Sequence, residues 1–228
     1  MATFNNARNI LVGASPLFLS VKDSTVSGYT ENMEPDSSAG VAFADGVSYT
    51  DTLNTAAVAA NPKFRNVGFT NNGLQITYNP SYGSVTVDQL LDTAKLFKES
   101  MEVMIATEMT EGTLENILAV FGQGADTLDR GSDVDTLGLA AGALGIAPTE
   151  RQLIAVGAAP TVDESGTNIT RSERVYYGRR VLSVQQSQFS LSRNAATTFP
   201  VTFRLLPSGM AGNEGEEYGF IVDRVLVA

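Results

Sequence analysis

The chain has 228 residues, of which 43% are hydrophobic and 8% aromatic, a composition typical of a globular protein with a sizeable core. It contains neither Cys nor His, which excludes disulfides, thiolate or imidazole metal sites, and catalysis that depends on a Cys nucleophile or a His base. The formal net charge is −10, from 25 acidic and 15 basic residues, and this sign disfavours tight binding to nucleic-acid phosphates.

The first 62 residues contain little regular pattern. Residues 2–9 are polar, and the apolar run at 10–12 is too short for a signal-peptide core or a membrane span, so we expect no membrane insertion. Residues 10–21 predict two short strand pieces with a break at 13–16. Residues 22–62 are polar and long for a loop, so we expect either an arm that orders against a neighbouring subunit or a surface excursion, with disorder as the alternative.

Residues 63–80 predict a β-hairpin. Two alternating runs flank the tetrapeptide TNNG, whose Asn-Gly pair accepts the positive φ that tight turns need. Leu74, Ile76 and Tyr78 would form the buried side of its second strand. Farther along, residues 88–99 are compatible with either a short amphipathic helix or an extended connection, which we expect to contact a neighbour.

Residues 101–122 predict a strand that leads into one helix. Side chains alternate over residues 102–109, as in a strand. Thr110 is expected as the helix N-cap, and Gly122 as a left-handed C-terminal cap. The helix should pack on the sheet through an apolar stripe of Leu114, Ile117, Leu118 and Phe121.

The rest of the chain is predicted to be β-structure. After a small, acidic segment at 123–150, strands are expected at 151–156, 175–184, 198–206 and 218–227, with an exposed, mobile loop at 207–217. The prediction is therefore a mainly β fold with one flanking α-helix, a β-sandwich or barrel forming a single domain over residues 1–228.

The candidate chemistry is sparse. The Asp residues between 126 and 135 lack the Gly and Glu positions of an EF-hand loop, so no metal site is expected, and no cofactor motif is present. A carboxylate-pair glycosidase is disfavoured because the acids are scattered through turns and Trp is absent. We therefore expect no enzymatic activity.

An Arg cluster is the main candidate for binding. Arg171, Arg174, Arg179 and Arg180 surround two Tyr residues. These residues could bind nucleic-acid phosphates. The excess of acidic residues in the first part of the chain instead favours a contact between subunits, in which these Arg residues pair with acids of the next copy.

Several segments in the same order resemble the major tail tube protein of long-tailed bacteriophages. They are NARNILVGASPLFLS, VGFTNNGLQITYNPSYGSVTVDQLLDTAKLFKESMEV, ATEMTEGTLENILAVFG, QLIAVGAAP, and FPVTFRLLPSG with YGFIVDRV. Together they cover most of the chain. The polar segment at 22–62 is the part that least resembles the family.

This resemblance implies a virion structural protein, assembled in the host cytoplasm, whose homo-hexameric rings stack into a tail tube with a barrel shared between subunits. The expected partners are the tape measure protein and the tail terminator and initiator proteins, and genomic DNA would pass through without specific binding. An acidic lumen would keep DNA from adhering, and we assign Glu99, Glu102 and Glu108 to it. The alternatives are a bacterial secretion-tube protein of related fold and a carbohydrate-binding β-sandwich module.

Overall fold

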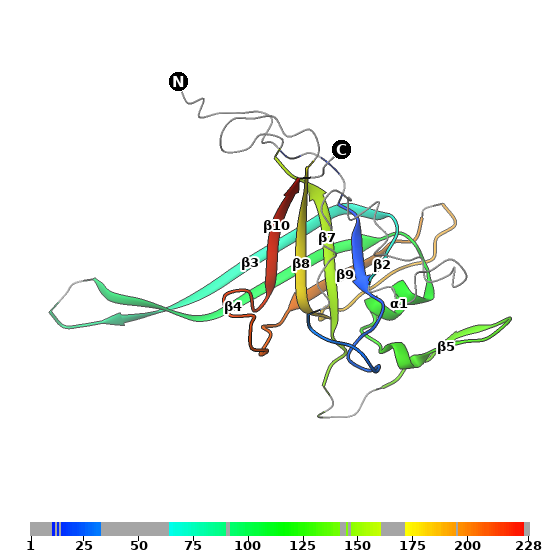
Figure 1. Cartoon of the computed structure of the whole chain (residues 1–228), viewed down its shortest axis with the longest axis horizontal. Helices are drawn as coiled ribbons and strands as arrows, with labels where there is room; N and C mark the ends of the chain where they lie inside the picture. Colours follow the sequence, from blue (N-terminus) through cyan, green and yellow to red (C-terminus); the bar gives the residue numbers. More distant parts are fainter. Residues whose placement is uncertain are drawn as a thin grey trace, which may run out of the picture.

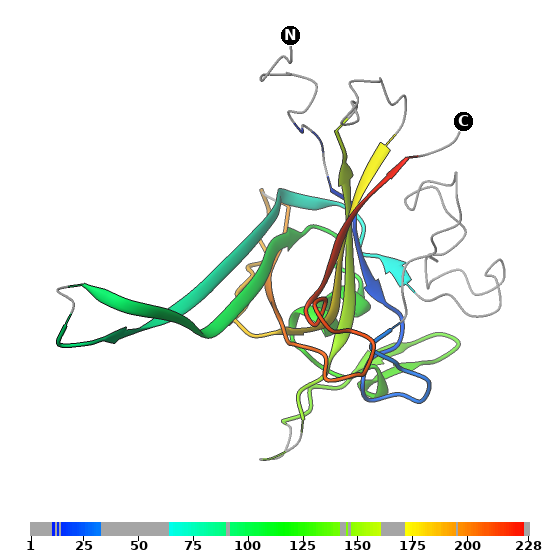
Figure 2. The same ribbon diagram turned by 60° about the vertical axis from the view of Figure 1, so that its left-hand side comes forward.

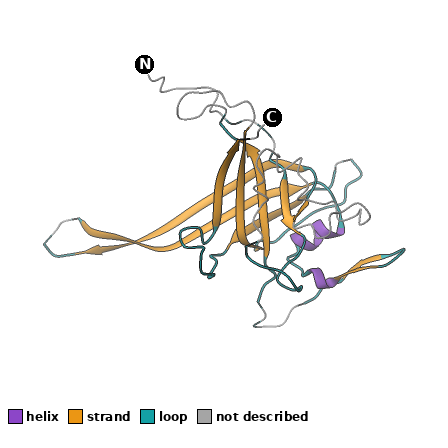
Figure 3. Cartoon of the chain, viewed as in Figure 1, coloured by secondary structure: helices purple, strands orange, loops and turns teal. Residues whose placement is uncertain are grey.

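The computed structural model describes residues 11, 13, 15–32, 64–89, 92–141, 145, 147–160, 172–194 and 196–225. Within them the protein is mainly β, with a large antiparallel sheet and one short α-helix (Figures 1 and 3). The strands are β1 (Leu17–Ser20), β2 (Phe64–Asn66), β3 (Thr70–Thr86), β4 (Thr93–Met109), β5 (Leu128–Arg130), β6 (Asp135–Leu137), β7 (Arg151–Ala158), β8 (Ser172–Ser183), β9 (Phe199–Leu205) and β10 (Gly219–Val225). The helices are α1 (Leu114–Val120) and the single 3₁₀ turn η2 (Ala125–Thr127).

The main sheet has the order β2-β1-β7-β8-β9-β4-β3, and β10 also pairs with β8. The first part of β8 lies between β7 and β10, whereas Val181, Leu182 and Ser183 pair with β9. Strand β8 therefore belongs to two parts of the sheet, one containing β1, β7 and β10 and the other containing β9, β4 and β3. The two parts diverge from β8, as Figure 2 shows. The described strands do not close into a barrel.

The main core lies between these two parts of the sheet. Leu19 of β1 and Leu153 of β7 face Ile105 of β4 and Phe203 of β9, and all four are at most 3% exposed. The alternation of β9 and of the second half of β4 explains this arrangement, because every second residue there faces inward. These two strands were predicted from that pattern, and the structure confirms them.

A second cluster covers the opposite face of β1, β7 and β8. It contains Phe18, Phe64, Ile154 and Val175, packed with Tyr29 of the segment after β1. Because both faces of β1 and β7 are buried, these strands read as nearly continuous apolar runs.

Strands β3 and β4 form a long ribbon that projects away from the rest of the molecule (Figures 1 and 2). Each has 17 residues, which at about 3.3 Å per residue corresponds to about 55 Å. Only Val103–Met109 of β4 pair with β9. The earlier residues of β4 pair with β3 alone, so the outer half of the ribbon leaves the body.

The predicted hairpin at 63–80 is wrong. Residues 64–66 form β2, which pairs with β1, and the TNNG sequence lies inside β3. Asn72 and Gly73 do adopt positive φ, of 60° and 67°, but they form a bulge opposite β4 at which the register shifts between Asn71 and Gln75. The ambiguous segment at 88–99 contributes the start of β4 from Thr93 onward, so this part is extended and not helical.

Helix α1 begins later than predicted. Its N-cap is Thr113, whose hydroxyl accepts from the Asn116 N–H at 3.3 Å, and not Thr110. Gly122 has φ of 66°, and the amides of Gly122 and Gln123 donate to the carbonyls of Ala119 and Leu118. These two hydrogen bonds form a Schellman motif, which confirms the predicted glycine cap.

The helix packs on the sheet through a face somewhat different from the predicted stripe. Leu118 is buried and Ile117 packs against the main core, but Leu114 is only half-buried. Phe121 is 39% exposed and stacks on Phe189. The buried face of α1 also includes Asn116, Ala119 and Val120. The amide of Asn116 donates to the carbonyls of Val67 and Glu111, which turns that side of the helix inward.

The loop at 207–217 is less exposed than predicted. Ser208 and Asn213 are buried, and the Asn213 side-chain amide donates to the Ser208 hydroxyl and to Asn32 Oδ1. Ser208 in turn donates to a Glu31 carboxylate oxygen at 2.6 Å. The segment at 22–32 is thus held against this loop, whereas residues 33–62 of the predicted arm lie outside the described residues.

Candidate functional site

The projecting ribbon exposes large apolar side chains. On β3 these include Ile76, Tyr78 and Tyr82, which are 42%, 60% and 60% exposed. On β4 they include Leu96 and Phe97, which are 64% and 46% exposed. The side of β3 that we predicted to be buried is therefore largely uncovered within the chain. Such a concentration of exposed apolar groups typically marks a surface that contacts another molecule.

The three predicted lumen acids share one face of the ribbon. Glu102 and Glu108 of β4 point away from the core, since Val103 and Ile105 between them are buried. The register shifts by one residue between Ser100 and Lys98, so Glu99 is an extra residue. Its carboxylate lies over Gly83, which is opposite Phe97 on the outer face. Glu99 therefore joins the other two acids on this face.

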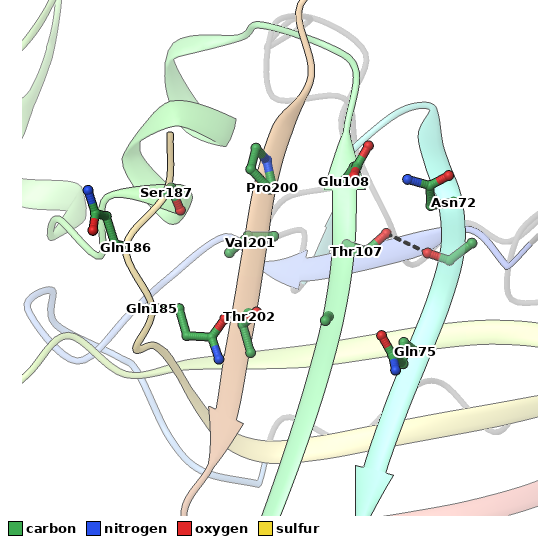
Figure 4. Close-up of a pocket in the computed structure, with 12 residues that line it drawn as sticks. Asn72, Gln75, Thr107, Glu108, Gln185, Gln186, Ser187, Pro200, Val201 and Thr202 are labelled. Atoms are coloured by element: carbon green, nitrogen blue, oxygen red, sulfur yellow. Dashed lines mark hydrogen bonds between the residues drawn. The ribbon is translucent and has the colours of Figure 1, made fainter. Parts of the chain in front are cut away.

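This outer face is otherwise polar. Glu108 accepts a hydrogen bond from Asn71, and Glu102 lies 3.5 Å from Arg204 of β9. A polar pocket of about 240 Å³ lies on the same face and is lined by Gln75, Glu108 and Thr202 together with the segment at 185–187 (Figure 4). Its lining consists mainly of amides and hydroxyls, with a single carboxylate, so it resembles a hydrated surface more than a catalytic centre.

An apolar groove opens where the two parts of the sheet diverge. It has a volume of about 510 Å³ and lies between the base of the ribbon and β10. Ile76, Met101 and Val103 line one side, and Tyr176 and Ile221 line the other. Ile221 is 64% exposed, so the groove is an unfilled extension of the main core.

Acidic side chains border this groove. Glu216 and Glu217 of the loop at 207–217 line it, and Glu214 is in the same loop. Glu216 pairs with Arg179 at 3.1 Å, whereas Glu214 and Glu217 accept from backbone amides of their own loop. Lys98 lines the opposite side, with its ammonium over the Tyr78 ring.

The predicted interface arginines have partners within the chain. Arg174 forms two hydrogen bonds, of 2.6 and 2.8 Å, with Asp223 on the neighbouring strand β10. These bonds hold the pKa of the Asp223 carboxyl below its usual value. Arg180 binds Glu150 through a bidentate pair, which raises the pKa of its guanidinium.

Arg179 is the most deeply placed of these side chains. It is 2% exposed, lies over the rings of Tyr177 and Phe220, and donates to Asn32 and Glu216. Its guanidinium is therefore satisfied by partners within the subunit. Arg171 lies outside the described residues. The prediction that these arginines bind a second copy stays a prediction, and their contacts within the chain already account for three of the four charges.

Sequence reasoning missed a buried ion pair between Asp23 and Arg151. Asp23 is 1% exposed and accepts from Arg151 at 2.7 Å, from Ala125 N–H and from Thr25. Burial lowers the pKa of Arg151, and the nearby Asp23 carboxylate opposes this shift. The sequence contains no pattern that predicts this ion pair, because the two residues are 128 positions apart.

Two further classes of site, a metal centre and a membrane-spanning helix, are absent from the described part of the chain. No group of three or more acidic side chains there is arranged to hold a metal ion. No helix among the described residues is long and apolar enough to cross a membrane. The prominent features of the described residues are thus exposed surfaces suited to contact with other molecules.

Comparison of the chain with known proteins gave no match, either to a protein-family model or to a curated protein.

Proposed function

We propose that this protein is the structural subunit of a bacteriophage tail tube. Six copies form a ring, and rings stack into a conduit through which genomic DNA leaves the virion. The observation that carries this proposal is the long β3–β4 ribbon, which presents exposed apolar side chains outside the body of its own subunit. A ribbon of this kind needs another molecule to cover it, and the segment resemblance to tail tube proteins supports a copy of the same chain.

The unpaired strand edges support the same proposal. Among the described residues, the outer edges of β3 and β10 pair with no strand. Exposed edges invite further pairing, and a closed barrel removes them. In the proposed ring, strands of neighbouring subunits extend each other's sheets into one shared barrel.

The outer face of the ribbon base is the proposed lumen wall. Its polar side chains and the acids Glu102 and Glu108 present negative charge to passing DNA, and Glu99 adds a carboxylate on the same face where the outer half of the ribbon begins. Like charge keeps phosphates from adhering to the wall, so DNA moves through without specific binding. In this account the chain needs neither cofactor nor catalysis, its partners are the tape measure, terminator and initiator proteins, and it is located in the virion tail.

Self-association can be tested by sedimentation velocity over a range of protein concentrations. We expect the native chain to form large species and a ribbon variant, Leu96→Ser with Phe97→Ser, to remain small. The matched control is Leu191→Ser, because Leu191 is 85% exposed on the loop after β8 and lies outside the ribbon. Equal behaviour of the ribbon variant and the native chain would contradict the proposed role of the ribbon.

The lumen assignment has a separate test. Changing Glu99, Glu102 and Glu108 together to Lys should slow DNA delivery by assembled virions while leaving the tubes intact, because cationic walls bind phosphate. The control replaces Asp129, Asp133 and Asp135 with Lys, which changes the net charge equally outside the ribbon. Unchanged infectivity of the first variant would remove these acids from the lumen.

A further inference from the structure

We infer that the apolar groove beside β10 receives the outer half of the β3–β4 ribbon from a second copy of the chain. This inference rests on the proposed self-assembly and specifies which two surfaces meet. The inserting surface, called here the donor face, consists of Val85, Lys95 and Phe97. The receiving surface is the groove between the ribbon base and β10.

The donor face is built by the register of the ribbon. Val85 is opposite Lys95, and Gly83 is opposite Phe97, so the three side chains lie on one side of paired strands. Val85 and Phe97 are 42% and 46% exposed. Among the described residues, Lys95 has no ion-pair partner. The face thus combines a cation with two uncovered apolar groups, and the Glu99 carboxylate lies beside Phe97, over Gly83.

The groove has the complementary composition. Met101, Val103, Tyr176 and Ile221 supply an apolar floor and wall. Glu217 lies at its border, and Glu214 lies in the same loop. Within the described residues neither carboxylate forms an ion pair, although Lys98 lies near enough to Glu217 to lower its pKa. If Phe97 of a second copy occupies the groove, Lys95 of that copy lies close to these carboxylates. This charge complementarity favours the ribbon over a purely apolar partner as the occupant of the groove.

The groove cannot be filled by the ribbon of its own subunit. Continuous pairing of β3 with β4 carries the outer half of the ribbon away from β10, as both views of the chain show (Figures 1 and 2). Val85 and Phe97 belong to this outer half. Donor and acceptor therefore belong to one chain but can meet only between copies. Such a contact uses two different patches, and repeated contacts of this type generate rings or filaments.

The absence of native Cys makes a cross-linking test clean. Phe97→Cys and Ile221→Cys are made as separate single variants, mixed, and oxidised. A docked pair raises the effective thiol concentration to the millimolar range, so we expect the mixed disulfide to form at least about tenfold faster than with Leu191→Cys in place of Ile221→Cys. All three positions are exposed, which keeps the variants folded.

A charge-reversal series provides the second arm. Lys95→Glu and Glu217→Lys should each weaken association several-fold, and the two changes together in one chain should restore it. The charge-matched control pairs Arg193→Glu with Glu217→Lys, because Arg193 is exposed and lies outside both surfaces. Restoration in the control to the same extent would overturn the pairing of Lys95 with this loop.

The outcomes separate this inference from the proposed function. Large assemblies without a preferred Phe97–Ile221 disulfide would overturn the docking and leave the tube proposal standing. A preferred disulfide in particles that never exceed small oligomers would support the docking and contradict the tube. Absence of both assembly and preferred disulfide, also in the presence of tail initiation components, would overturn both.

Discussion

Asp23 and Arg151 join three distant parts of the chain through one buried ion pair. The Asp23 carboxylate also accepts from the Ala125 amide at the start of η2. Charges removed from water need such partners, because a buried ion without one is strongly disfavoured. This pair therefore supports the fold that presents the ribbon.

Removing the Asp23 carboxylate should destabilise the protein strongly. We expect Asp23→Ala to lower the free energy of unfolding by about 3–5 kcal/mol, because it leaves the Arg151 guanidinium buried and unpaired. Urea unfolding followed by circular dichroism measures this change. The control Asp129→Ala, at an exposed position, should change stability by less than about 0.5 kcal/mol. A loss from Asp23→Ala no larger than that of the control would contradict the structural role.

The Arg174–Asp223 pair predicts a dependence of stability on pH. The Asp223 pKa is lowered in the folded protein, so its contribution is present above the unfolded pKa, about 3.9 for Asp, and is lost as pH falls through the folded value. Both side chains are partly exposed, which limits the contribution to at most about 1 kcal/mol. The stability difference between the native chain and Asp223→Asn should be constant from pH 5 to 8 and shrink in more acidic solution. A difference that grows as pH falls would exclude this linkage.

At the scale of elements, the bulge at Asn72 and Gly73 sets the start of the ribbon. Both residues have positive φ, a conformation that costs a residue with a β-carbon about 1–2 kcal/mol. We expect Gly73→Ala to destabilise the protein by about this amount. Gly209→Ala is the matched control, because Gly209 also has open space around it but no positive φ. Thermal unfolding distinguishes them, and equal melting temperatures would argue against a conformational requirement at Gly73.

Strands with a buried face could be predicted from the sequence. Alternation in β4 and β9 is imposed by one covered side, and the same alternation correctly groups Glu102 with Glu108. It fails for Glu99, which is an odd-numbered residue and reaches the shared face only because the register shifts beside it. A bulge has no reliable sequence signal when its residues are ordinary polar ones.

The ribbon and the groove could not be predicted from the sequence, for a different reason. The outer half of the ribbon packs on nothing in its own chain, so its apolar spacing carries no constraint from a core, and residues 88–99 fitted helix and strand equally. The Asn-Gly pair favours positive φ, which serves a bulge as well as a turn. The groove and the partners of the arginines depend on contacts between residues far apart, such as Arg174 with Asp223.

At the scale of the whole molecule, the residues that stabilise the fold are different from those that are available for contact with other molecules. The core between the two parts of the sheet and the buried Asp23, Arg151 and Arg179 hold the body together. The ribbon, the groove and the open strand edges lie outward from that body. A subunit with these properties is suited to repeated association through unlike surfaces, which is the central claim of the proposed function.

Electron microscopy of the concentrated protein in negative stain tests that claim most directly. The account predicts rings or stacked tubes with a central channel, and six-fold symmetry in views along the axis. Particles that remain monomeric at every concentration, and also fail to join tubes when mixed with tail initiation components, would contradict it.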